Sequence, residues 1–212
     1  GRDKLKLQQT TPFPSEWEAQ VAWINQHNAE WIHSARVFSP ALLIDFLALT
    51  DPQLYDYFKT LPPLGISGPA VSWAGESSSQ NWFDIAREYT EKWLHQQHIR
   101  EAVGAPILDQ RKWLHPVLDT FLRALPHTYR NAAAEKGTAI IIKISGDAGG
   151  DWSLLRQRGK WHLFTGLAPH PVTSFTLDLN VAWRLFTIVM SPSSAPLQVE
   201  GNREFVSMIL HM

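Results

Sequence analysis

The chain has 212 residues, of which 44% are hydrophobic and 18% charged, a balance typical of a folded globular protein and not of a disordered one. Its 19 Lys and Arg residues against 20 Asp and Glu residues give a net charge of −1, and therefore no electrostatic reason to expect a nucleic-acid or membrane partner. The absence of cysteine excludes disulfides and thiolate chemistry, and no stretch approaches the roughly 18 to 20 apolar residues of a membrane span, so we expect a cytoplasmic protein.

The first part of the chain has the apolar spacing of helices. Apolar residues recur at intervals of three and four from Trp17 to Ala35, which predicts a first helix. A second helix is expected from Ser39, with Pro40 in its first turn, and a third over residues 51–60. Residues 61–69, rich in Pro and Gly, interrupt this pattern.

Residues 81–100 are the most informative segment and predict one helix. At about 100° per residue, one stripe of this helix carries Asp84, Glu88, Glu91, His95 and His98. Glu91 and His95 are one helical turn apart, so both can reach one metal ion. A carboxylate and an imidazole together suit zinc, iron or nickel.

The common alternative for such a stripe is a solvated helix face. Two ligands are also too few, because a catalytic zinc ion has three protein ligands and a water. His98 lies two turns from Glu91, which is far for one ion. His27 and His33 on the first predicted helix could supply a third ligand, although surface or core histidines are more common.

The second part of the chain changes from helical to strand-like spacing. Gly104 to Pro106 marks the expected boundary between domains 1–105 and 106–212, and a helix over residues 109–133 should be kinked or split at Pro116 and Pro126. Arg158-Gly159 is expected to form a hairpin turn. The expected strands are 138–145, 151–156, 160–165, 172–178 and 197–201, with helices over 178–189 and 202–210. This order predicts an α+β fold with a mostly antiparallel sheet.

Two other features carry weaker signals. The glycine-rich segment 146–151 lacks the Lys-Ser/Thr of a phosphate-binding loop, so a turn is expected there. His162, next to Trp161 on a predicted strand, could face a pocket, although a structural role is more common for such a residue.

The segment from Arg87 to Pro106 resembles the last bundle helix of the mycothiol-dependent maleylpyruvate isomerase-like family, within the DinB/YfiT-like metalloenzyme superfamily. Family members carry a Glu-x-x-x-His pair, then Ile-Arg and a Gly-x-Pro exit. The matching residues are Glu91, His95, Ile99, Arg100, Gly104 and Pro106. Residues 28–31 and 42–61 resemble the preceding helices of the family.

The resemblance implies a four-helix bundle whose metal site combines Glu91 and His95 with a histidine from an earlier helix. In the family that histidine lies near a Trp-Thr-x-x-Asp-x-x-x-His-Leu sequence, which does not occur in this chain. The chain also begins at Gly1 without an initiator methionine. We therefore expect the bundle to lack its first helix, with the third ligand upstream of residue 1.

Residues 172–178 and 195–205 resemble the C-terminal domain of the same family, which is similar to sterol-carrier-protein domains. Together these resemblances imply an N-terminal DinB-like helical bundle followed by a sterol-carrier-like α+β domain. They imply a metal-dependent isomerase or transferase that uses a low-molecular-weight thiol such as mycothiol on a small electrophilic substrate, with zinc the first choice of metal and nickel or iron alternatives.

Other functions remain open. The chain could instead be a non-enzymatic module that binds a small apolar ligand or a lipid, or a regulatory protein. A bundle without its first helix would expose apolar surface, so a homodimer is also possible.

Overall fold

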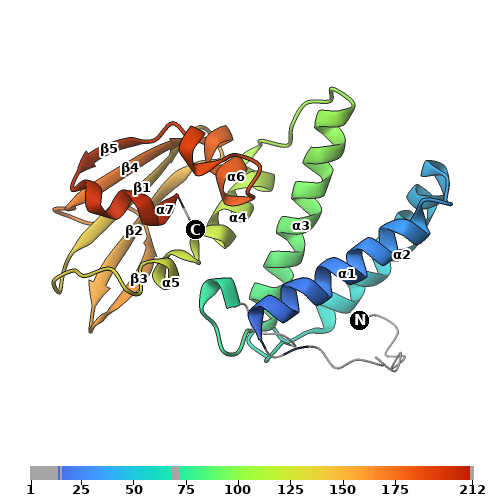
Figure 1. Cartoon of the computed structure of the whole chain (residues 1–212), viewed down its shortest axis with the longest axis horizontal. Coiled ribbons are helices and arrows are strands. Elements are labelled where there is room, and N and C mark those ends of the chain that lie inside the picture. The colour runs from blue at the N-terminus through green and yellow to red at the C-terminus, as the bar shows by residue number, and fades with distance from the viewer. Residues whose placement is uncertain (1–13, 15, 68–71, 211–212) are drawn as a thin grey trace. The chain divides into compact units, whose positions relative to one another are not determined.

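The computed structural model describes residue 14, residues 16–67 and residues 72–210. The chain forms two compact units, Gly1–Gly65 and Ile66–Met212, and each is described by itself. The first unit is a helical hairpin and the second combines helices with a five-stranded sheet (Figure 1). The predicted α+β class is therefore confirmed. None of the described helices has the length and hydrophobicity needed to cross a bilayer.

The hairpin consists of α1 (Trp17–Ala35) and α2 (Pro40–Thr60), so the predicted first helix is confirmed. The Ser39 hydroxyl accepts a hydrogen bond from the backbone nitrogen of Leu42 at 3.2 Å and caps α2. The prediction of a separate helix from residue 51 is wrong, because α2 continues through Pro52. Proline removes only one backbone donor, and hydrogen bonds on both sides keep the helix continuous.

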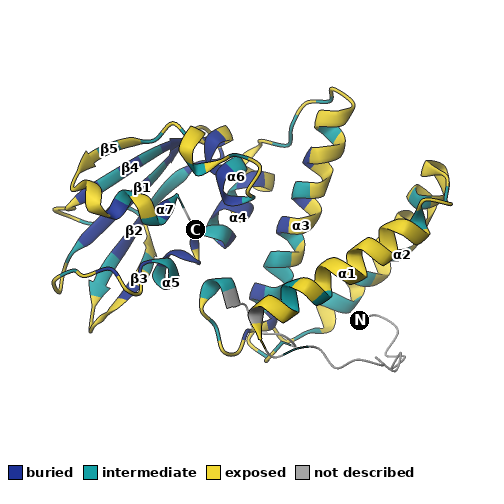
Figure 2. Cartoon of the chain, in the orientation of Figure 1, coloured by how far each residue is buried: buried dark blue, intermediate teal, exposed yellow. Residues whose placement is uncertain are grey.

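The hairpin has little interior of its own. No residue of α2 is buried, and Figure 2 shows exposed residues along both helices. Large apolar side chains are among those exposed, with Trp31 at 63%, Ile44 at 64% and Leu49 at 63%. Two helices alone do not enclose a core, so the apolar spacing of this segment is not matched by burial within the unit.

The second unit begins with a short bridge between Ile66 and Gln80, the turn η1 (Ser72–Ala74) and α3 (Asn81–Ala102). The long helix predicted over residues 81–100 is thus present. Two short helices follow, α4 (Arg111–Leu122) and α5 (Leu125–Thr128). The chain is split before Pro126, as expected, whereas Pro116 lies inside α4 without ending it.

Helix α3 belongs to the second compact unit because it packs on α4 and the loop before it. The Trp93 indole donates to the Leu108 carbonyl at 3.1 Å, and the Gln97 side-chain oxygen accepts from the Leu108 backbone nitrogen at 3.0 Å. The compact units therefore differ in extent from the predicted domains 1–105 and 106–212, whose boundary stays a prediction.

The sheet is mixed, with strand order β3-β2-β1-β4-β5. The strands are β1 (Ala139–Ser145), β2 (Gly150–Gln157), β3 (Lys160–Thr165), β4 (Thr173–Asp178) and β5 (Gln198–Gly201). The central pair β1–β4 is parallel, and the other neighbours are antiparallel. The prediction of a mostly antiparallel sheet did not include this parallel pair. Tight turns force antiparallel neighbours, but the longer loop after β3 lets β4 align with β1 in either direction.

The β2–β3 hairpin turns at Arg158 and Gly159, as predicted. Both residues have positive φ, 50° and 76°, which is the conformation of a two-residue turn matching the twist of the strands. The register pairs Gln157 with Lys160 and Arg156 with Trp161. The turn therefore fixes which side chains of the two strands lie beside one another.

The core of the second unit lies between the sheet and the helices. Helix α4 contributes Leu114, Val117 and Leu118, which are fully buried. Helix α6 (Leu179–Phe186), capped by Asp178, contributes Trp183, and it ends three residues before its predicted end at residue 189. The turn η2 (Pro192–Ser194) precedes β5. After β5, Asn202 caps the turn η3 (Arg203–Phe205), which leads into α7 (Val206–Ile209).

Candidate functional site

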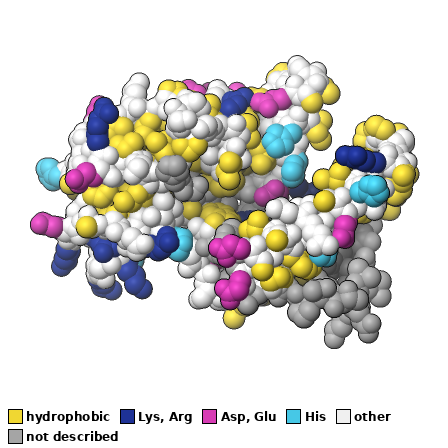
Figure 3. All heavy atoms as spheres, viewed as in Figure 1, with side chains coloured by type: hydrophobic (Ala, Val, Ile, Leu, Met, Phe, Trp, Pro, Cys, Tyr) yellow, Lys and Arg dark blue, Asp and Glu magenta, His cyan; other side chains and the backbone are white. Residues whose placement is uncertain are grey.

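The predicted Glu91–His95 pair forms on the surface of α3. The His95 Nε2 lies 3.5 Å from the Glu91 Oε2, and the two side chains are 70% and 63% exposed. The His98 ring lies edge-on to the His95 ring, with centroids 5.8 Å apart. Histidine side chains are visible at the surface over α3 in Figure 3. The sequence pattern thus brings these three side chains together, in a solvent-exposed position.

The rest of the stripe is acidic and crowded. The Asp84 carboxylate forms an ion pair with Arg87 at 3.1 Å. Displacement of water by surrounding atoms raises the pKa of Glu88, and the nearby Asp84 carboxylate raises it further, while Arg87 opposes this effect. Repulsion between neighbouring carboxylates favours a bound proton or another cation on this face.

The donors on α3 do not complete a metal centre. Within the residues that the structure describes, no group of three or more His, Asp and Glu side chains is arranged to hold a metal ion. His27, on α1 of the other unit, bonds through Nδ1 to the Trp23 carbonyl at 2.8 Å and stacks on the Trp23 ring. Glu91 and His95 supply two donors, one fewer than a catalytic zinc site requires.

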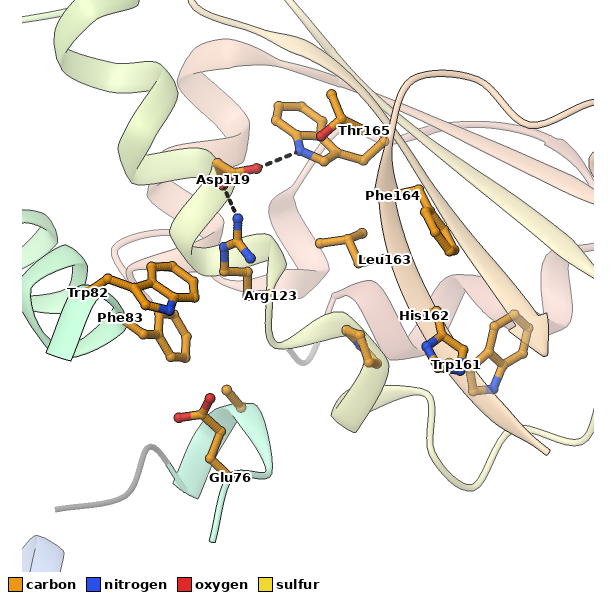
Figure 4. Close-up of a pocket in the computed structure, with 13 residues that line it drawn as sticks. Glu76, Trp82, Phe83, Asp119, Arg123, Trp161, His162, Leu163, Phe164 and Thr165 are labelled. Atoms are coloured by element: carbon orange, nitrogen blue, oxygen red, sulfur yellow. Dashed lines mark hydrogen bonds and ion pairs between the residues drawn. The ribbon is translucent and has the colours of Figure 1, made fainter. Parts of the chain in front are cut away.

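A more enclosed site lies within the second unit. It is a cavity of about 430 Å³ between the loop that follows η1, the start of α3, helices α4 and α5, and strands β2 and β3 (Figure 4). It is lined by Ala74, Glu76, Trp82, Phe83, Asp119, Arg123, Pro126, Trp152, Trp161, His162, Leu163, Phe164 and Thr165. We call it the aromatic pocket.

Asp119 connects two walls of the aromatic pocket. Its Oδ1 accepts a hydrogen bond from the Trp152 indole at 3.0 Å, and its Oδ2 accepts one from Arg123 at 2.8 Å (Figure 4). Trp152 is only 1% exposed, so this bond satisfies a buried donor. The Arg123 guanidinium in turn lies 4.8 Å from the centre of the Trp82 ring. These contacts hold β2, α4 and the start of α3 in fixed relation.

Flat apolar faces make up much of the lining. Trp82 and Phe83 have ring centroids 5.2 Å apart. Phe164, on β3, also lines the pocket and is 45% exposed. Aromatic side chains favour stacked or edge-on contact with planar ligands.

Glu76 extends from the loop after η1 toward Trp82 and Phe83 (Figure 4). Its Oε2 is buried and has no hydrogen-bond partner in the described part of the chain, and the same is true of the Trp161 Nε1. Buried polar atoms are nearly always paired in folded proteins. Among the described residues that line the pocket, the Glu76 Oε2 is therefore an acceptor without a hydrogen bond, and the Trp161 Nε1 is a donor without one.

Sequence reasoning missed most of these residues. His162 was expected to be able to face a pocket, and it does line this one. Glu76, Asp119 and Arg123 come from separate elements with no shared spacing, so no local pattern marks them. The one available signal was the i,i+4 spacing of Asp119 and Arg123, which is common on ordinary helix surfaces.

Comparisons with known proteins add little. No family model matches the sequence, and no curated protein matches it. Among solved structures, the chain is similar to Sterol Carrier Protein 2 Like 2 from Aedes aegypti, with a TM-score of 0.34 and 10% sequence identity. The likeness covers 45% of this chain and 94% of that one.

Proposed function

We propose that the second unit is a binding module for a small molecule with a planar apolar body and a hydrogen-bond donor. The observation that carries this proposal is the buried Glu76 Oε2, which lines the pocket together with aromatic rings and has no hydrogen-bond partner among the described residues. This function corresponds to the non-enzymatic, apolar-ligand alternative that the amino-acid sequence leaves open.

The size and order of the aromatic pocket support this function. Its volume of about 430 Å³ lies within the range of roughly 300 to 1,000 Å³ that small-molecule sites occupy. The Asp119 contacts to Trp152 and Arg123 hold the walls in place before a ligand arrives, which lowers the entropic cost of binding. A donor group on the ligand would satisfy Glu76, and its rings would stack on Trp82 or Phe164.

A titration with N-phenyl-1-naphthylamine, an uncharged fluorescent probe with planar rings and one N–H donor, tests this function. We expect saturable binding that Phe164→Ala weakens roughly 2- to 12-fold, because an aromatic contact contributes about 0.5–1.5 kcal/mol. Glu76→Gln retains an acceptor and should weaken binding less than Glu76→Ala. Phe46→Ala on α2 is the matched control, since Phe46 is also about half exposed, at 41%. Absence of saturable binding would refute the function.

A metal-dependent enzyme is a second candidate, supported by the 3.5 Å approach of His95 to Glu91. In this proposal the chain would be a thiol-dependent isomerase or transferase with a DinB-like bundle, like the family that its α3 resembles. Glu91 and His95 would hold the divalent ion with a third ligand from outside the described residues. The ion would supply Lewis-acid chemistry when bound.

Calorimetric titration with Zn²⁺ separates this candidate from a solvated helix face. One strong site that is lost in both Glu91→Ala and His95→Ala would support it. Glu135→Ala, which also removes one exposed carboxylate, should leave such binding unchanged. Equal zinc uptake by all four proteins would reduce the pair to a surface feature.

A further inference from the structure

A second hollow adjoins the aromatic pocket and has a different character. It has a volume of about 360 Å³ and is lined by Ala74, Gly75, Pro126, His127, Arg130, Arg156, Gly159, Lys160 and Trp161. Three of these side chains are cations and none is an acid. We call it the basic cleft. Figure 3 shows Lys and Arg side chains gathered around the end of the sheet where β2 turns into β3.

The cations of the basic cleft come from three places in the fold and are held by local structure. The Arg130 Nη1 donates to the His127 carbonyl at 2.8 Å. The Arg156 guanidinium lies 5.7 Å from the centre of the Trp161 ring, its cross-strand partner. Lys160 follows the two positive-φ residues of the β2–β3 turn, so the turn sets its position.

The charges of the basic cleft have no acidic partner among the residues that the structure describes, because Arg130, Arg156 and Lys160 form no ion pair there. Burial lowers the pKa of His127, and the positive charge of Arg130 lowers it further. Three unpaired cations around one hollow make a site of positive potential.

The two hollows share a wall. Ala74, Pro126 and Trp161 line both of them. Gly75 lets the backbone after η1 lie against the His127 ring, because a Cβ at this position would lie 2.2 Å from the His127 Nδ1. A molecule lying along Trp161 would therefore meet aromatic faces on one side and cations on the other.

We propose that the basic cleft binds the oxyanion group of the same ligand whose planar body occupies the aromatic pocket. The inference rests on the proposed function and narrows its ligand class to planar apolar molecules that carry a carboxylate, phosphate or sulfonate. Arg130 and Arg156 offer charge-assisted hydrogen bonds with fork geometry, and Lys160 offers a compact positive charge.

The test compares two probes that differ by one anionic group. The full chain is titrated with 1-anilinonaphthalene-8-sulfonate and, separately, with uncharged N-phenyl-1-naphthylamine. We expect the sulfonate to bind at least about tenfold more tightly at low salt and to lose this advantage as ionic strength rises. Arg156→Gln and Lys160→Gln should each weaken sulfonate binding about 3- to 10-fold and change binding of the neutral probe less than twofold.

Controls keep the test decisive. Lys112→Gln removes one exposed charge from α4, outside both hollows, and should leave the sulfonate affinity unchanged. Arg156→Lys should restore part of the affinity that Arg156→Gln loses, which a folding defect would not do. Displacement of the sulfonate probe by 2-naphthoate or by 2-naphthyl phosphate would support the proposal and identify the preferred oxyanion.

The outcomes for the two proposals are distinguishable. If neither probe binds, the proposed function fails. If the neutral probe binds and the sulfonate probe binds no more tightly, the basic cleft is not an anion site and the inference alone is overturned. The same holds if Lys112→Gln weakens sulfonate binding as much as Arg156→Gln does.

Discussion

Asp119 allows a direct test of what orders the aromatic pocket. Its carboxylate accepts from a buried indole and also forms an exposed ion pair, with the Arg123 and Asp119 side chains 41% and 30% exposed. Asp119→Ala leaves the Trp152 N–H buried without a partner, which costs about 1–3 kcal/mol, and removes an i,i+4 pair worth about 0.3–0.5 kcal/mol. We therefore expect a loss of roughly 1.5–3.5 kcal/mol in the free energy of unfolding.

Asp119→Asn separates the two contributions. The amide oxygen can still accept from Trp152, so only the ion pair is lost and the cost should be about 0.3–0.5 kcal/mol. Arg123→Ala removes the same pair and the contact over Trp82, so it should cost about 1 kcal/mol.

Urea unfolding monitored by tryptophan fluorescence measures the free energy of unfolding of all three variants. If this free energy depends on urea concentration with the same slope in each variant, only stability has changed. If Asp119→Asn is as costly as Asp119→Ala, the ion pair and not the buried hydrogen bond dominates, and this account of the pocket wall is refuted.

Two further predictions concern the same unit. Burial raises the pKa of Tyr129 well above its usual value of 10.0, so the folded state keeps this proton while the unfolded state releases it. The free energy of unfolding should be unaffected by this group below about pH 9 and should fall above about pH 10, by up to roughly 1.4 kcal/mol per pH unit. The free energy of unfolding of Tyr129→Phe should depend less on pH in this range. An equal dependence in the two proteins would contradict Tyr129 as its cause. Gly75→Ala should lower the melting temperature more than Gly104→Ala, because both glycines have positive φ but only Gly75 has a neighbour, His127, within 4 Å. Gly75→Ala should also weaken probe binding in the aromatic pocket. If the two variants lower the melting temperature equally, contact with His127 is not the cause of the effect at Gly75.

The elements of the fold were largely predictable because their signals are local. The helix carrying Glu91, the β-branched run of β1 and the turn at Arg158 each follow from spacing or turn chemistry within a few residues. The continuity of α2 through Pro52 and the parallel β1–β4 pair were not foreseen. Both depend on contacts and chain paths that no short window contains.

The candidate sites show the same limit. The i,i+4 spacing of Glu91 and His95 predicted their contact on one helix face, but could not tell whether a third ligand would join them. The aromatic pocket depends on Glu76, Asp119 and Phe164, which lie on a loop, a helix and a strand. Their proximity results from packing between elements, so tertiary structure was needed to find the site.

The sheet order has a consequence for how the second unit folds. Strands β1, β2 and β3 are joined by short turns, so their pairing closes small loops and can form early. The central ladder joins Ile140 to Thr173 and requires β4 to return past the whole meander, so it forms at a larger entropic cost. Until β4 arrives, the edge of β1 is unpaired, and a nascent chain at this stage is open to strand pairing with another copy. Refolding yield should therefore fall as protein concentration rises, even if the native protein is fully stable.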